Sequence, residues 1–99
     1  MPYHVRHRER IRELLREWRL PDEVLVDVYL ALADDRLGVD PPRTLLRMRE
    51  PFDGMVYSFT VQEPQRAVCY HTFLFHVLYG ADETTLWVID GSYIRTDNL

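Results

Sequence analysis

The sequence predicts an α+β fold, in which two N-terminal antiparallel helices pack on one face of a three- to four-stranded antiparallel sheet. Apolar residues recur at helical spacing in the first third of the chain, and they alternate at strand spacing after residue 55. A run of helices followed by a run of strands is typical of the α+β class. With 99 residues, the chain is expected to form a single domain, residues 1–99, that buries a core without disulfides.

The first predicted helix covers residues 8–19. Its apolar residues follow the spacing i, i+3, i+4, i+7 of an amphipathic helix, and they are Ile11, Leu14, Leu15 and Trp18. Nearly all of the other positions are Arg or Glu. Glu9 with Arg12, and Glu13 with Arg16, are spaced to form i, i+3 ion pairs on its surface.

The second predicted helix begins at Pro21, which suits a first helical turn, and Gly38 is expected to supply a left-handed cap after its end. It is richer in apolar residues than the first helix. We therefore expect the second helix to be the more buried of the two.

Three strands are predicted after the helices, at residues 55–61, 68–79 and 84–90. The last one is expected to continue through a β-bulge at Gly91. Residues 3–5 are a candidate short edge strand at the N-terminus. Because successive strand residues point to opposite faces, the strand 68–79 sends one histidine to each face of the sheet.

The face with Phe73, Phe75 and His71 is the more apolar one, so we expect it to hold the helices. The other face is expected to be open and is the natural place for a binding site, since it carries Ser58, Thr60, Tyr70, Thr72 and His76.

Charge is distributed unevenly along the chain, whose net charge is −4. Residues 1–20 hold six arginines and three glutamates, whereas residues 21–40 hold six acids and one arginine. All cations are arginine, which either reflects genome composition or suits phosphate recognition by the planar guanidinium. An acidic total argues against tight non-specific binding of nucleic acid.

The N-terminus is polar, and no apolar run is long enough to span a membrane, so a cytoplasmic location without membrane contact is expected. The single Cys69 permits no internal disulfide and is interpreted as a buried small hydrophobe. His4 and His7 lack the accompanying ligands of a metal site. No metal or cofactor is predicted.

Gly54 precedes an alternating strand, which is followed by Phe75-His-Val-Leu-Tyr79 and then by residues 86–90 with Tyr93 and Arg95. This order of elements resembles the RelE/ParE superfamily of small bacterial toxins. The resemblance implies a RelE-like fold and a toxin that a cognate antitoxin protein holds inactive. It also implies a messenger-RNA endonuclease that acts on the ribosome and inhibits translation. The alternative is a non-catalytic module that binds a protein partner, either DNA gyrase or an antitoxin.

By the same resemblance, His76 stands where the family strand has an arginine, and Tyr93 and Arg95 stand in the C-terminal region that supplies catalytic groups. RNA cleavage needs a proton acceptor, a proton donor and positive charge at the phosphate. His76 would act as acid or base, Arg95 would stabilise phosphate charge, and Tyr93 would stack on a base or donate a proton. Alternatively, His76 is a hydrogen-bonded structural residue.

The predicted substrate-binding residues are Arg66, Ser58 and Thr60. Arg66 falls in the loop before the central strand, where an arginine is either solvated or in contact with a phosphate. Ser58 and Thr60 stand where the family often has basic residues, and the chain has no lysine. This departure weakens the catalytic interpretation and favours the protein-binding alternative.

Overall fold

The computed structural model describes residues 3–39, 46–47, 55–63, 69–82 and 84–97. Within these residues the chain forms two helices and five strands, so the α+β class is confirmed, although the sequence predicted a sheet of only three or four strands. In chain order the elements are β1 (His4–His7), α1 (Glu9–Glu17), α2 (Asp22–Ala31), β2 (Leu46–Arg47), β3 (Met55–Gln62), β4 (Cys69–Tyr79) and β5 (Thr85–Asp97).

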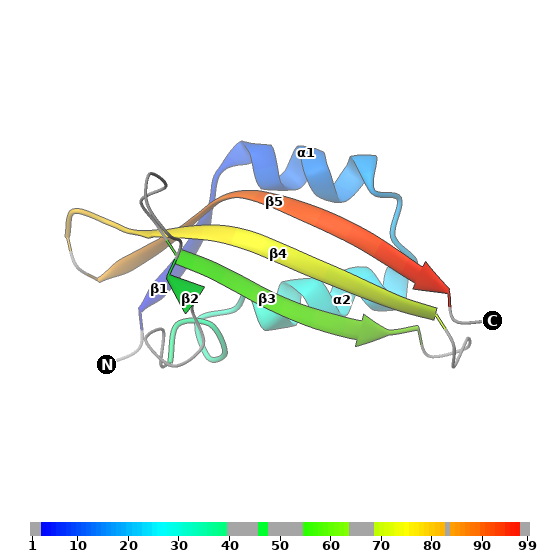
Figure 1. Cartoon of the computed structure of the whole chain (residues 1–99). Coiled ribbons are helices and arrows are strands. Elements are labelled where there is room, and N and C mark those ends of the chain that lie inside the picture. The colour runs from blue at the N-terminus through cyan, green and yellow to red at the C-terminus, as the bar shows by residue number, and fades with distance from the viewer. Residues whose placement is uncertain (1–2, 40–45, 48–54, 64–68, 83, 98–99) are drawn as a thin grey trace.

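The strands form one sheet in the order β1-β5-β4-β3-β2, and both helices lie on one face of it, behind the strands in Figure 1. The pairs β2–β3, β3–β4 and β4–β5 are antiparallel, but β1 runs parallel to β5. The prediction of an antiparallel sheet is therefore wrong at this edge, and the sheet is mixed. A parallel pair needs a long crossover between its strands, and everything from α1 to β4 provides it.

β5 continues beyond residue 90 as predicted, but its bulge lies in a different place. The pairing with β4 shifts between His76 and Val77, which face Asp90 and Val88. Ile89 is thus the extra residue on β5, two positions before Gly91. Gly91 instead makes room for Phe75, since a Cβ at this position would lie 2.7 Å from Cδ1 of that ring.

The core lies between the helices and the face of the sheet that they cover, called the inner face below. β4 contributes Phe73, Phe75 and Val77, each fully buried. Trp18, just after α1, packs on the inner face with ring centroids 5.9 Å from Phe73 and 5.4 Å from a stacked Tyr93. α1 adds three buried residues, which are Ile11, Leu14 and Leu15.

α2 buries Val24 and Val28 but leaves an apolar ridge uncovered, so the prediction that α2 is the more buried helix is wrong. Val26, Tyr29 and Leu30 are 55%, 46% and 52% exposed. α2 has apolar residues around most of its circumference and packs against the sheet on one side only. We call these three residues the α2 ridge.

The left-handed backbone that was expected at Gly38 occurs at Arg19, directly after the last turn of α1, where φ is 49°. Gly38 has a different role, because an added Cβ would lie 2.3 Å from the carbonyl oxygen of Tyr3. The absence of a side chain lets the backbone N–H of Tyr3 donate to the Gly38 carbonyl at 2.8 Å. This contact holds the start of the chain against the segment after α2.

Asp34 makes a second connection between these two segments. The backbone N–H of Val5 donates to Oδ1 of Asp34 at 2.7 Å, and His4 Nδ1 lies 3.3 Å from Oδ2. The hydrogen bond from Val5 is the largest cause that lowers the pKa of the Asp34 carboxyl.

Among the described residues, neither α1 nor α2 has the length and the apolar content of a transmembrane helix.

Substitution of Gly91 by Ala should destabilise the fold by about 1–3 kcal/mol, because the buried Phe75 ring must move to admit the new methyl group. Urea unfolding followed by circular dichroism measures the change. Ser92→Ala, at the adjacent exposed position on the opposite face, is the matched control and should be nearly neutral. Equal stability of the two variants would contradict this role of Gly91.

Asp34→Asn should lower the urea midpoint at pH 7 but not at acid pH. The pKa of Asp34 is lower in the folded than in the unfolded chain, so its stabilisation is complete above the unfolded pKa. It is lost as the pH falls through the folded pKa, below about pH 4. Asp35→Asn is the control, and a midpoint difference for Asp34→Asn that persists at about pH 2 would refute this assignment.

Candidate functional site

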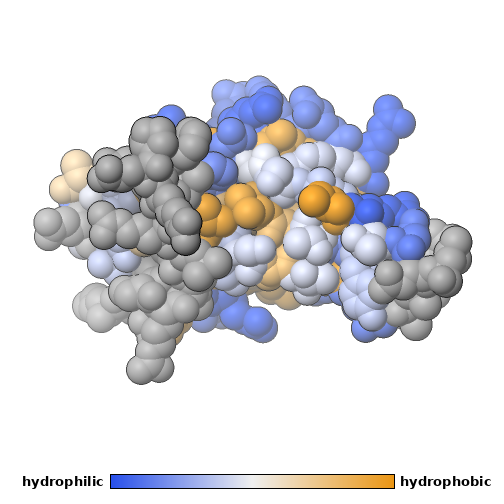
Figure 2. Space-filling view, viewed as in Figure 1, coloured by the Kyte–Doolittle hydropathy of each residue, from blue (hydrophilic) through white to orange (hydrophobic). Residues whose placement is uncertain are grey.

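The outer face of the sheet, which the helices leave uncovered, carries three of the predicted site residues. Ser58 and Thr60 are exposed on β3, and Thr60 Oγ1 lies 3.1 Å from Oγ1 of Thr72 on β4. His76 is half-buried between Val56 and Asp90 of the neighbouring strands. Figure 2 views this face, which is largely weakly polar with a few apolar side chains.

Tyr93 and Arg95 lie on the inner face, away from His76. Tyr93 pairs with Phe73, and Arg95 pairs with His71. Strict alternation from Val88 would place both on the outer face, but the extra Ile89 reverses the direction of every later side chain of β5. The three predicted catalytic residues are therefore not brought together. Arg66 lies outside the described residues.

The outer face carries one described arginine, Arg6 on the edge strand β1, which pairs with the outward-facing Trp87 of β5. The described outward positions of β3 and β4 hold no arginine and no acidic residue, and on β5 the one charged residue is Asp90. Arg10 of α1 approaches this carboxylate at 3.8 Å. The three central strands therefore offer mainly weak polar contacts, and a single arginine at the β1 edge supplies little of the charge that a nucleic-acid backbone requires.

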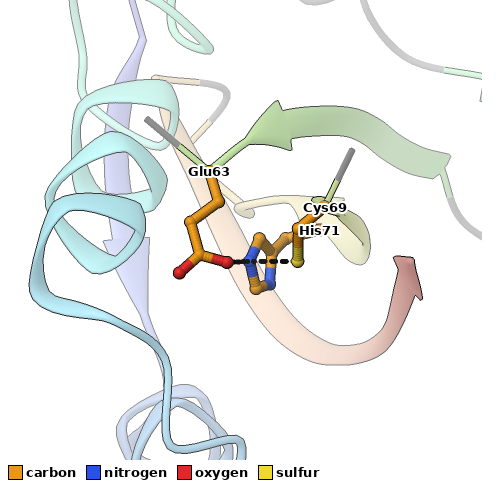
Figure 3. A group of neighbouring side chains, drawn as sticks. All are labelled: Glu63, Cys69 and His71. Atoms are coloured by element: carbon orange, nitrogen blue, oxygen red, sulfur yellow. Dashed lines mark hydrogen bonds and ion pairs between the residues drawn. The ribbon is translucent and has the colours of Figure 1, made fainter. Parts of the chain in front are cut away.

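A polar cluster instead forms on the inner face, where β3 ends, β4 begins and β5 ends. His71, only 1% exposed, is its centre. Its Nδ1 is hydrogen-bonded to the Tyr93 hydroxyl. Its Nε2 lies 3.4 Å from Oε2 of Glu63 and 3.7 Å from Sγ of Cys69, and Figure 3 shows both groups directed at the ring.

Electrostatics in this cluster oppose a cysteine nucleophile. Burial is the largest cause that raises the pKa of Cys69, to about 11, and hydrogen bonds with the carboxylates of Glu63 and Asp97 act in the same direction. The thiol is therefore protonated at neutral pH, whereas a nucleophilic cysteine needs a lowered pKa. Arg95 lies nearby with its Nε 3.5 Å from Oδ2 of Asp97, which raises the pKa of the guanidinium.

Sequence reasoning missed Glu63 and set Cys69 aside. Glu63 follows β3 directly and hydrogen-bonds back to Cys69 through its backbone N–H, at 2.9 Å. A carboxylate beside a loop has no distinctive spacing from a cysteine six residues later. The sequence pattern that could have indicated this cluster is Cys69-x-His71, because residues two apart on a strand share a face.

A second feature lies on the opposite side of the helices from the sheet, between α1 and α2. Arg12, Arg16 and Arg19 line a cleft of about 370 Å³ whose walls also include Leu20, Leu25 and Tyr29. The predicted pairs of Glu9 with Arg12 and of Glu13 with Arg16 do not form; Glu13 lies 3.9 Å from Arg10 instead. No carboxylate of the described residues lies in ion-pair contact with the three arginines of this basic cleft.

The basic cleft adjoins the α2 ridge through Tyr29, which belongs to both. Charged and apolar surface are thus continuous along the same pair of helices. Such a combination of exposed aromatic, aliphatic and arginine side chains is typical of protein–protein interfaces.

No family model matches the chain, and no curated protein or solved structure shows significant similarity to it. The RelE/ParE resemblance accordingly stays a prediction.

Cys69 should be inert to a thiol reagent such as dithionitrobenzoate in the native protein and react stoichiometrically once urea unfolds the chain. Its burial and raised pKa both suppress the thiolate that attacks the reagent. Absorbance of the released thiol measures the rate. Rapid labelling without denaturant would show that Cys69 is accessible and contradict the buried cluster.

Proposed function

We propose that this chain is the toxin component of a bacterial toxin–antitoxin pair and that its α1–α2 surface docks an acidic helical segment of the antitoxin. The observation that carries the proposal is the uncovered α2 ridge beside the basic cleft. The toxin assignment rests on the RelE/ParE resemblance and on the matching order of helices and strands.

The chemistry of the surface favours this occupant. An amphipathic helix docks through apolar anchors one turn apart, and the α2 ridge offers apolar side chains at i, i+3 and i+4 for it to cover. Acidic residues along the edge of that helix would meet Arg12, Arg16 and Arg19. Complementary charge speeds association and selects the partner, although the chain as a whole is acidic.

The messenger-RNA endonuclease is the second candidate. What favours it is that Tyr93 and Arg95 are neighbours at the C-terminal end of β5, as the family resemblance implies. What weighs against it is the separation of His76 from both and the lack of arginine at the described outward positions of β3, β4 and β5. Gyrase binding belongs to the same class as the first proposal and stays a prediction.

Isothermal titration calorimetry with the full chain tests the docking surface. The probe is a synthetic amphipathic helical peptide with leucines on one face and glutamates beside them, and the matched probe carries lysines in place of the glutamates. The acidic peptide should bind and the basic one should not. Tyr29→Glu and Arg16→Glu should each weaken binding at least about tenfold.

Two variants serve as controls. Ile94→Glu changes a residue that is 66% exposed on the outer face, and Arg8→Glu removes an exposed arginine outside the basic cleft. Both should bind the acidic peptide as the natural chain does. Equal binding of the two peptides, or equal losses in controls and test variants, would overturn the docking surface.

Induced expression in a bacterial host tests the toxin assignment itself. Growth arrest without cleaved messages supports the proposal. Arrest with accumulating cleaved messages would favour the endonuclease instead. Normal growth at a confirmed level of folded protein would contradict both.

A further inference from the structure

We infer that Glu63, Cys69 and His71 form a binding site for one Zn²⁺ ion at the inner-face end of the sheet. The ligands are a carboxylate oxygen, the Sγ and the Nε2, and these three atoms all lie within 4.8 Å of one another. The site is independent of the docking surface, which lies on the outer side of the helices.

The spacing of the donor atoms fits a single tetrahedral ion. With Zn–S bonds of about 2.3 Å and Zn–N and Zn–O bonds of about 2.0–2.1 Å, tetrahedral angles separate S from N by about 3.6 Å and N from O by about 3.3 Å. The corresponding distances are 3.7 Å from Sγ to Nε2 and 3.4 Å from Nε2 to Oε2. The third separation, from Sγ to the carboxylate oxygen, is at most 4.8 Å, compared with about 3.6 Å in an ideal tetrahedral site.

The same three groups can form hydrogen bonds in the absence of an ion. When Nε2 of His71 is protonated it donates to the Glu63 carboxylate, and the Cys69 thiol forms hydrogen bonds with the carboxylates of Glu63 and Asp97. On metal binding the ring proton is carried by Nδ1 and the thiol loses its proton, so that all three atoms act as ligands.

The rest of the cluster resembles the surroundings of zinc-bound histidines. The Tyr93 hydroxyl bonds to Nδ1 of His71, the nitrogen that points away from the proposed ion, and so sets the orientation of the ring. Tyr93 is itself held by stacking on Trp18, with ring centroids 5.4 Å apart. We assign Tyr93 as a positioning residue for this site.

Charge and donor type select the metal. One thiolate and one carboxylate neutralise a divalent cation, so the loaded site is uncharged in buried surroundings, and the thiol proton passes to solvent on binding. Thiolate and imidazole favour zinc over magnesium or calcium. Three protein ligands leave a fourth position for solvent near Glu63, whose side chain is 14% exposed.

Titration of the full chain with Co²⁺ tests thiolate ligation directly. One equivalent should produce a thiolate-to-cobalt charge-transfer band with the visible bands of tetrahedral cobalt, and one equivalent of Zn²⁺ should abolish them. Calorimetry should give a 1:1 stoichiometry for Zn²⁺. The absence of a charge-transfer band, whether or not the visible cobalt bands appear, would overturn the site. This measurement uses the natural chain and needs no substitution.

Variants locate the ion. Cys69→Ser should remove the charge-transfer band and weaken Zn²⁺ binding at least about 100-fold, and Tyr93→Phe should weaken it about 10- to 100-fold while keeping the band. Asp90→Asn, an exposed carboxylate on the outer face, is the control and should bind as the natural chain does. Circular dichroism of the metal-free variants confirms that they fold. Unchanged affinity in folded Cys69→Ser would place the ion elsewhere and refute the inference.

Discussion

The alternation of side chains along β4 is the constraint on which the rest of the structure depends. Every second residue from Cys69 to Val77 is buried, and those between them are half-buried. β4 lies between β3 and β5 and pairs with each over most of its length, so its pleat also sets the faces of its neighbours. A slip of one residue would bring His76 to the core and move Phe73 to solvent, which makes any other register costly.

This constraint divides the molecule into surfaces with different chemistry. The outer face of β3, β4 and β5 is weakly polar, with Arg6 on the edge strand β1 as a described arginine beside it, whereas the polar groups with metal-binding or acid–base chemistry gather at one end of the inner face around His71. The helices cover the middle of the inner face and turn the α2 ridge and the basic cleft outward. A protein partner on the helices and a metal ion at the end of the sheet would occupy separate surfaces. Metal binding would also link the start of β4 to the end of α1, because Tyr93 bonds to His71 and stacks on Trp18.

Periodicity was enough to predict the helices, the three long strands and the opposite environments of His71 and His76, because these depend on local patterns. The features that the sequence did not predict depend on how separate elements meet. The partner of β1 is about 80 positions away in the sequence, so the parallel edge left no local signal. Ile89 looks like any strand residue, yet it reverses the faces of Tyr93 and Arg95 and thereby divides the predicted catalytic set. Glu63 joins Cys69 and His71 only when the hairpin closes. The exposure of Tyr29 and Leu30 likewise depends on how much of α2 the sheet can cover, which an apolar pattern does not specify.

We propose that the cluster around His71 on the inner face, and not the outer face, holds the chemically active group of this protein. Long-range ¹H–¹⁵N NMR spectra of the histidine rings, recorded with and without one equivalent of Zn²⁺, test it most directly. We expect the Nε2 resonance of His71 to shift to a metal-bound position, while Nδ1 keeps its bond to Tyr93 and the resonances of His76 are unchanged. A shift at His76, or at the N-terminal His4 and His7 with none at His71, would contradict it.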